Sequence, residues 1–468
     1  MSIRTLFHLL PALVLIVSHT VAAKVPAADK HEPAPADFGS QIRFKVEKYK
    51  LDNGLTVLIH EDHSAPIVSY QTWFRVGSKN EEPGFTGIAH LFEHMMFKGA
   101  GRYSGEKLET ILQTNGAINN AFTTHDYTGY YENLPSSKLQ IIMDIEADRM
   151  QNLQVNAENL KSEREVVKEE RRFRVDNNPT GILREVMFGT TFKVHPYRWP
   201  VIGYMTDLDN ITTEKAVEFY HTYYSPNNAV LVVAGDVDPT EVKRLVNQYY
   251  GAMPAQKIPD RPRPTEPPQS GTRTVTVEKE IQSPQFAIVY RTPKAGTDES
   301  YALDLLANIL GAGKSSRLYN RLVYKDQVAT SVHTSNYTLQ ESGLFQIYVN
   351  IKPGASHHKA QKAVYGEMWR PRNLKISKDE LLKAKNQVMK GYVDALKTIH
   401  GRAETLALNE ALFGDYERLF KDLEMYQSVT AEQIQKAAAK FLVAEKSTFV
   451  LLTPPKKQKK SSGSKGSH

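Results

Sequence analysis

The chain has 468 residues, of which 41% are hydrophobic and 24% are charged, as in ordinary soluble proteins with more than one domain. The formal net charge is +7, but five lysines lie in the C-terminal run 455–468. The rest of the chain is nearly neutral, so the charge gives no argument for a nucleic-acid partner. The absence of cysteine excludes a disulfide scaffold, a thiol nucleophile and a thiolate zinc site. Any metal ion must therefore be bound by His, Asp or Glu.

The N-terminus has the pattern of a secretory signal. Arg4 precedes the apolar stretch 6–17, and small residues follow up to a predicted cleavage site that ends a signal peptide at 1–23. Residues 24–40 are rich in proline and alanine and predict a flexible lead-in. The alternative is an uncleaved anchor, but the apolar stretch is shorter than the ~20 residues of a membrane span and contains Pro11. We expect an exported protein, periplasmic in a bacterium, without stable membrane insertion.

A proline-rich linker at 254–271 divides the remaining chain into two halves of similar size, 41–253 and 272–453, before a lysine-rich disordered tail at 454–468. Both halves follow the same order of elements. The matching segments are the strands 68–76 and 285–291, the helices 85–97 and 300–310, the closing helices 213–224 and 431–441, and the closing strands 229–234 and 447–452. This order predicts an α+β fold of two homologous domains, each a mostly antiparallel sheet covered by helices.

The helix predicted in the first half carries a group of polar residues that could bind a metal ion. His90, Glu93 and His94 lie in the otherwise apolar segment 87–99, and their spacing places them on one helix face. Two imidazoles so placed can converge on one cation, and a cation also compensates a buried glutamate. The alternative is a pair of core histidines that hydrogen-bond to the glutamate between them. The inverted His-x-x-Glu-His pattern favours the metal.

A third protein ligand is expected from the acid-rich helical stretch 161–172. Glu163 and Glu170 are two turns apart on the same face of this helix. Glu165 and Glu169 fall on other faces, where they pair with neighbouring basic side chains in solvent. Spacing alone leaves both Glu163 and Glu170 as candidates.

These motifs resemble the pitrilysin or insulinase family of zinc metallopeptidases. Further stretches that resemble the family are 53–59, 74–78, 116–123, 224–228, 233–236 and 315–319. The resemblance covers most of 45–453, and in length the chain is similar to two-domain members such as the mitochondrial processing peptidase subunits. In that family the last metal ligand corresponds to Glu170, and Glu163 corresponds to a supporting catalytic acid.

The resemblance implies a zinc-dependent endopeptidase that cleaves short unfolded peptides in a chamber formed by two homologous subunits. His90, His94 and Glu170 would hold one Zn²⁺, and Glu93 would act as general base toward the attacking water. The peptide substrate would add as a β-strand to an exposed sheet edge. The residues that match this edge are Asn120, Ala121, Phe122 and Thr123.

One departure from the family concerns the second half of the chain. Active single-chain members carry an Arg and a Tyr there that contact substrate, whereas the aligned stretch 325–332 has Asp326 and Thr330 at those positions. The stretch 303–308, which corresponds to the metal-binding helix, has no set of ligands. We therefore expect a homologous partner subunit that supplies the Arg/Tyr pair.

Two other functions are weighed against this one. Relatives with this fold serve as non-catalytic assembly subunits, but these usually lack the ligand set that is intact here. A nucleotide site is not expected, because the loop 311–315 ends like a phosphate-binding loop but has Asn308 in place of its first glycine.

Overall fold

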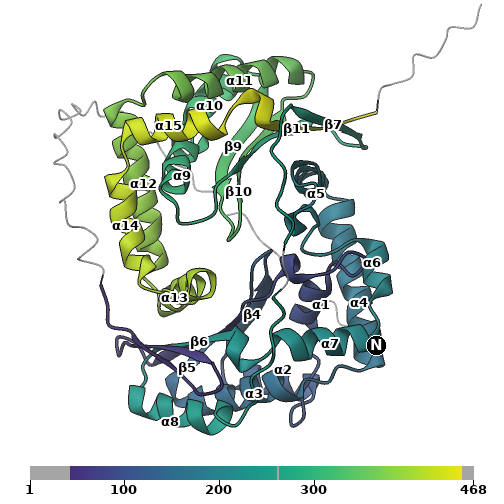
Figure 1. Ribbon diagram of the computed structural model, residues 1–468, viewed down its shortest axis with the longest axis vertical. Coiled ribbons are helices and arrows are strands. Elements are labelled where there is room, and N and C mark those ends of the chain that lie inside the picture. The colour runs from purple at the N-terminus through teal and green to yellow at the C-terminus, as the bar shows by residue number, and fades with distance from the viewer. Residues whose placement is uncertain (1–42, 261–262, 456–468) are drawn as a thin grey trace, which may run out of the picture. The chain divides into compact units, whose positions relative to one another are not determined.

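Two β-sheets flanked by helices make up the computed structural model, which describes residues 43–260 and 263–455 (Figure 1). The predicted signal peptide, the lead-in and nearly all of the lysine-rich tail lie outside the described residues. Within the described part, every helix is too short or too polar to cross a membrane.

The first sheet has six strands in the order β1-β2-β6-β3-β5-β4. Its strands are β1 (Glu47–Lys50), β2 (Thr56–Glu61), β3 (Ile67–Phe74), β4 (Ile118–Thr123), β5 (Thr128–Pro135) and β6 (Ala229–Gly235). All neighbouring strands are antiparallel except β2 and β6. Among the described residues, strand β4 pairs with β5 alone, so its other edge is free to pair with an added strand.

The second sheet has five strands in the order β7-β11-β8-β10-β9, and only β7 and β11 are parallel. Its strands are β7 (Arg273–Glu278), β8 (Gln285–Thr292), β9 (Ala329–Tyr337), β10 (Gly343–Ile351) and β11 (Ser447–Thr453). In the first sheet, the strand β6, which follows the predicted closing helix, lies between β2 and β3. In the second sheet, β11 lies in the same way between β7 and β8. The predicted α+β class with two mostly antiparallel sheets is confirmed.

Eight helices precede the second sheet along the described chain, and seven lie among or after its strands. The first group is α1 (Ile88–Met95), α2 (Gly105–Thr114), α3 (Leu139–Asn152), α4 (Ala157–Arg171), α5 (Pro179–Thr191), α6 (Met205–Asn210), α7 (Thr213–Tyr223) and α8 (Pro239–Tyr250). The second group is α9 (Asp298–Gly311), α10 (Arg317–Tyr319), α11 (His357–Asn373), α12 (Lys378–Ala395), α13 (Ile399–Phe413), α14 (Arg418–Ser428) and α15 (Ala431–Phe441).

One face of each sheet packs against helices of its own half. In the first half, apolar residues of α1, α3, α4, α7 and α8 meet the sheet in a continuous core, to which α1 contributes Leu91, Phe92 and Met95. In the second half, α9, α11 and α15 form the corresponding core. Burial of these side chains, at about 25 cal/mol per Å² of apolar surface, fixes α1 and α4 beside each other on the first sheet.

The opposite face of each sheet is covered by a helix from the other half of the chain. Helix α13 packs on the first sheet, and α5 packs on the second (Figure 1). The contacts of α13 with the first sheet join Ala403, Leu406 and Ala407 to Leu58, Trp73, Val230 and Val232. Those of α5 with the second sheet join Leu183, Met187 and Phe188 to Ala287, Val289 and Val450. Both faces of the central strands of each sheet are therefore buried.

Candidate active site

Contacts at the N-terminus of helix α1 fix where the helix begins. Gly87 precedes it with a φ of 91°, and a Cβ there would lie 2.6 Å from the carbonyl oxygen of Ile202. The buried carboxylate of Glu81 accepts hydrogen bonds of 3.0 Å from the backbone N–H groups of Gly87 and Ala89. This carboxylate satisfies free donors at the start of the helix. The helix therefore begins later than the predicted range 85–97 and is shorter, which corrects that boundary.

Three side chains from α1 and α4 converge on one point. The Glu170 Oε2 atom lies 3.6 Å from His90 Nε2 and 3.2 Å from His94 Nε2. All three donor atoms lie within 4.8 Å of one another, and no other such group of three occurs in residues 43–260 and 263–455. Metal–ligand bonds of 2.0–2.1 Å in a tetrahedron would separate ligand atoms by about 3.3 Å. The distances from Glu170 to the two histidines are close to this separation, so the three residues fit a single metal ion.

The two imidazoles of this cluster have opposite electrostatic environments. Burial lowers the pKa of His90 to about 4, and the ring of His94 adds to this effect. Burial also acts to lower the pKa of His94, but the nearby carboxylates of Glu163 and Glu170 outweigh it and raise that pKa to about 9. The hydrogen bond from His94 is the main reason why the pKa of Glu170 is lowered. The surroundings of His94 thus favour a positive charge, whereas burial disfavours a proton on His90.

Glu163 lies behind His94 and does not join the three converging ligands. Its Oε2 atom is 3.6 Å from His94 Nδ1, the ring nitrogen that faces away from Glu170. Its Oε1 atom pairs with Lys98 Nζ at 2.9 Å. Burial acts to raise the pKa of Glu163, but His94 and Lys98 together lower it. A carboxylate at this position orients a metal-binding imidazole. Helical spacing left two candidates for the third ligand, and these distances separate Glu170 from Glu163.

Glu93 connects the cluster to the edge strand. Its Oε2 atom lies 4.0 Å from His90 Nε2 and accepts a 2.7 Å hydrogen bond from Thr123 Oγ1, at the end of β4. Burial raises the pKa of Glu93, although the bond from Thr123 opposes the effect. The predicted edge residues 120–123 all lie in β4, and Phe122 packs edge-on against Trp73 on the far face of the sheet.

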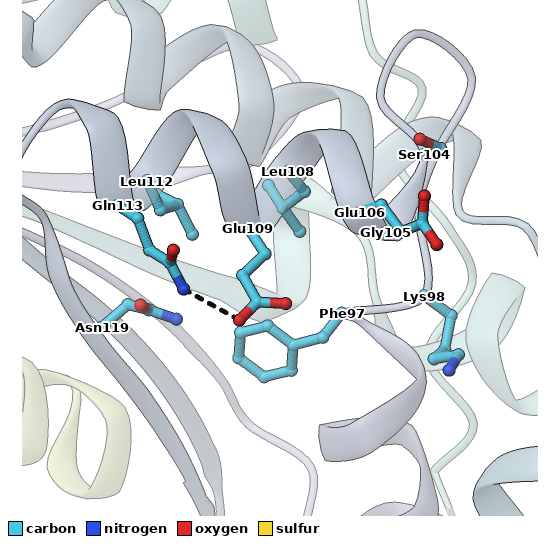
Figure 2. A pocket seen from close by; sticks show the side chains of 10 residues that line it. All are labelled: Phe97, Lys98, Ser104, Gly105, Glu106, Leu108, Glu109, Leu112, Gln113 and Asn119. Carbon is cyan, nitrogen blue, oxygen red and sulfur yellow. Dashed lines mark hydrogen bonds between the residues drawn. The ribbon is translucent and has the colours of Figure 1, made fainter. Parts of the chain in front are cut away.

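Two cavities lie toward opposite ends of β4. The first, of about 570 Å³, lies between α2 and β4, and Figure 2 shows the Phe97 ring and Asn119 at its wall. In the same view, Gln113 Nε2 donates a 2.9 Å hydrogen bond to Glu109 Oε1. The second cavity, of about 450 Å³, is lined by residues that include His90, Glu170 and Thr123. The converging ligands therefore border the second cavity, and both cavities are large enough for side chains.

Some contacts of the site carry no local signal in the sequence. Lys98 beside Glu163 and Thr123 beside Glu93 are brought in by tertiary packing. Arg174, whose Nε is 2.8 Å from Glu170 Oε1, is a local contact. Arg174 is four residues after Glu170, and this helical spacing is the one signal that could have indicated it.

Comparisons with known proteins identify the family of the chain. The family profile described as "Insulinase (Peptidase family M16)" matches residues 56–204, and the one described as "Peptidase M16 inactive domain" matches residues 210–388. Zinc protease PqqE of Helicobacter pylori is 30% identical over 421 residues, which cover 88% of this chain and 93% of the relative. The uncharacterized zinc protease YmxG of Bacillus subtilis is 25% identical, and the match covers 87% of this chain and 98% of YmxG.

Solved structures share the fold. The crystal structure of a protease from Helicobacter pylori matches with a TM-score of 0.83 at 29% identity, covering 88% of this chain and 100% of that chain. The structure of a peptidase M16 inactive domain from Pseudomonas fluorescens, at 17% identity, has the same fold with a TM-score of 0.78, covering 88% of this chain and 98% of that chain. The sequence matches and the shared fold, with the His90, His94 and Glu170 cluster in place, lead to one conclusion: the chain belongs to the insulinase family of peptidases, M16.

Proposed function

We propose that this protein is a zinc-dependent endopeptidase that cleaves short unfolded peptides. The observation that carries the proposal is the convergence of His90 Nε2, His94 Nε2 and Glu170 Oε2 at distances that suit one metal ion. Two histidines and a glutamate form a ligand set known from catalytic zinc sites, in which the fourth position is left to water. The names of PqqE and YmxG as zinc proteases support the choice of metal and reaction.

Each side chain around the cluster has a role in hydrolysis. When bound, zinc supplies Lewis-acid chemistry toward a water molecule and the scissile carbonyl. Glu93 takes the proton of the attacking water and passes it to the leaving amine, because it lies beside the cluster with a raised pKa. Thr123 holds one oxygen of Glu93 and leaves the other free for the proton. Glu163 orients the His94 ring from behind.

The free edge of β4 would bind the peptide backbone. An added strand on this edge places the peptide beside Glu93, because Thr123 at the end of β4 contacts that carboxylate. Asn119 and Thr123 are about 13 Å apart at about 3.3 Å per residue, so a bound peptide would extend past both cavities. Backbone pairing makes this binding tolerant of peptide sequence, while the cavities select side chains.

We also propose that full activity requires a homologous subunit. The positions at which the resemblance implies an Arg and a Tyr hold Asp326, which pairs with Arg321 at 2.8 Å, and Thr330, an exposed residue of β9. A partner subunit of the same fold would supply the missing Arg and Tyr. The N-terminal signal pattern supports an exported location, periplasmic in a bacterium.

The test separates chemistry from metal binding. Glu93→Gln is expected to keep one zinc per chain and to reduce cleavage of an unstructured peptide by about 10²–10⁴-fold, because the general base is lost. Glu170→Gln is expected to lose zinc as well as activity. Glu169→Gln, an exposed change on the same helix, is the matched control and should retain both. Cleavage is measured with and without a homologous subunit that carries the Arg/Tyr pair. Unchanged activity of Glu93→Gln would show that the protein is not this peptidase, and a purely structural role in an assembly would survive that substitution.

A further inference from the structure

The second cavity beside the cluster differs in charge from the first. Besides the ligands His90 and Glu170, its lining includes Arg174, Arg184 and Glu185. Glu185 is already neutralised, because both of its oxygens accept hydrogen bonds from Arg171, at 2.7 and 3.2 Å. Glu170 is shared between the histidines and Arg174. Both carboxylates of the lining are therefore engaged.

Arg184 is the cation without a counter-ion in this cavity. No described carboxylate lies within ion-pair distance of it, in contrast to Arg174 and to Arg171 behind Glu185. Its guanidinium instead lies over the rings of Phe188 and Tyr337, at 5.8 and 5.6 Å from their centroids. Stacking of this kind holds the guanidinium in place. One side of it also hydrogen-bonds to Tyr337. Because a guanidinium has five N–H donors, the remaining donors can bind a carboxylate.

His125 adds an unpartnered polar group to the same cavity. Its side chain is 3% exposed, and neither ring nitrogen has a hydrogen-bond partner among the described residues. The ring stacks on Phe188 at 4.9 Å and meets Tyr337 edge-on, so it shares both aromatic contacts of Arg184. Burial, with Arg184 as the next cause, lowers the pKa of His125 to about 3. The neutral ring therefore has one N–H that is free to donate.

We infer that this cavity is a subsite for a carboxylate on the peptide substrate, bound by Arg184 and His125. The inference rests on the proposed function and adds a substrate preference to it. A peptide bound along β4 would reach this cavity at Thr123, which also contacts the general base Glu93. The peptide residue that carries the carboxylate would therefore lie near the scissile bond. The carboxylate belongs to an Asp or Glu side chain or to the chain terminus. The two sources share the same chemistry and are separated in the experiment below.

The test compares matched peptides that differ only by Glu or Gln at one position, moved along an otherwise neutral sequence. Binding is measured with zinc-loaded Glu93→Gln protein, which does not require turnover, and cleavage is measured with the unaltered chain. One position is expected to favour Glu over Gln by about tenfold in affinity and in kcat/KM, as for a charge-assisted hydrogen bond. Amidated and free C-termini are compared. If the preference is seen only with a free C-terminus, the subsite binds the terminal carboxylate of the peptide. If it persists in the amidated peptide, the subsite binds the carboxylate of a side chain.

Variants then connect the preference to the cavity. In the Glu93→Gln background, Arg184→Gln is expected to remove the preference and Arg184→Glu to reverse it in favour of Lys, without loss of zinc. His125→Phe keeps the stacking on Phe188 and is expected to weaken the preference a few-fold. Lys362→Glu makes the same charge change at an exposed site on α11 and should keep the preference.

The outcomes distinguish the subsite from the proposed function. Equal binding and equal cleavage of the Glu and Gln peptides at every position overturn the subsite but leave the peptidase intact. A preference in Arg184→Glu that is unchanged from that of the parent protein also overturns it. Discrimination in binding without any zinc-dependent cleavage supports the subsite and counts against the proposed function.

Discussion

Glu163→Gln tests whether the carboxylate behind His94 orients a ligand or is a ligand itself. The substitution keeps the size of the side chain but removes the charge that faces His94 Nδ1 at 3.6 Å and Lys98 Nζ at 2.9 Å. Loss of such an outer partner typically lowers metal affinity by about 10–100-fold. Because 3.6 Å is longer than a good hydrogen bond, we expect the lower end, a rise of about tenfold in the zinc Kd, or about 1.4 kcal/mol.

The assay is competition for zinc against a chromophoric chelator, with metal content measured in parallel. One zinc per chain is expected at saturation in Glu163→Gln, but not in Glu170→Gln. Glu169→Gln, whose side chain is 70% exposed on the same helix, controls for loss of charge and should bind zinc as the unaltered chain does. If Glu163→Gln cannot be saturated with zinc, Glu163 is itself a ligand. If its zinc Kd equals that of the control, Glu163 does not orient His94.

Three further predictions concern stability. Leu406→Ala in α13, at a fully buried position against the first sheet, should lower the free energy of unfolding in urea by about 2–5 kcal/mol; a loss below about 1 kcal/mol would contradict the described packing. Zinc at about a hundred times its Kd should stabilise the folded chain by about 2.7 kcal/mol, seen as a fall in Tm on chelation, and Glu170→Gln should show no such fall. His125 has a folded-state pKa of about 3, below its ordinary value of about 6.5, so the unfolded chain binds the proton first and stability falls as pH drops below about 6.5. The slope is up to about 1.4 kcal/mol per pH unit. His125→Phe should flatten this slope between pH 6 and 4, and an identical pH profile would show that the buried ring does not titrate as described.

Local patterns in the sequence indicated much of the fold and the centre of the site. Helical spacing placed His90, Glu93 and His94 on one face, and the structure brings all three to the same cluster. The closing helices and strands of both halves were predicted to within about two residues, because apolar periodicity and turn residues are local signals. Spacing could not separate Glu163 from Glu170, since both lie on one face of α4, and only their distances to the two nitrogens of His94 do so.

Contacts between distant parts of the chain could not be predicted from the sequence. In β3, both Tyr70 on one face and Gln71 and Trp73 on the other are buried, because α13 comes from more than 300 residues later to cover the second face. The boundary of α1 was misplaced for a related reason. Its start depends on Glu81 and on the close approach of Gly87 to Ile202, neither of which is a helical pattern.

The exchange of α5 and α13 between the two sheets has a consequence for how this chain can be dissected. Cutting it in the proline-rich segment would yield two fragments, each with an apolar sheet surface whose cover is carried by the other fragment. Fragments produced separately should therefore aggregate, and those produced together should recombine into a stable pair. The two halves of the chain would then have to be produced together to give a stable protein.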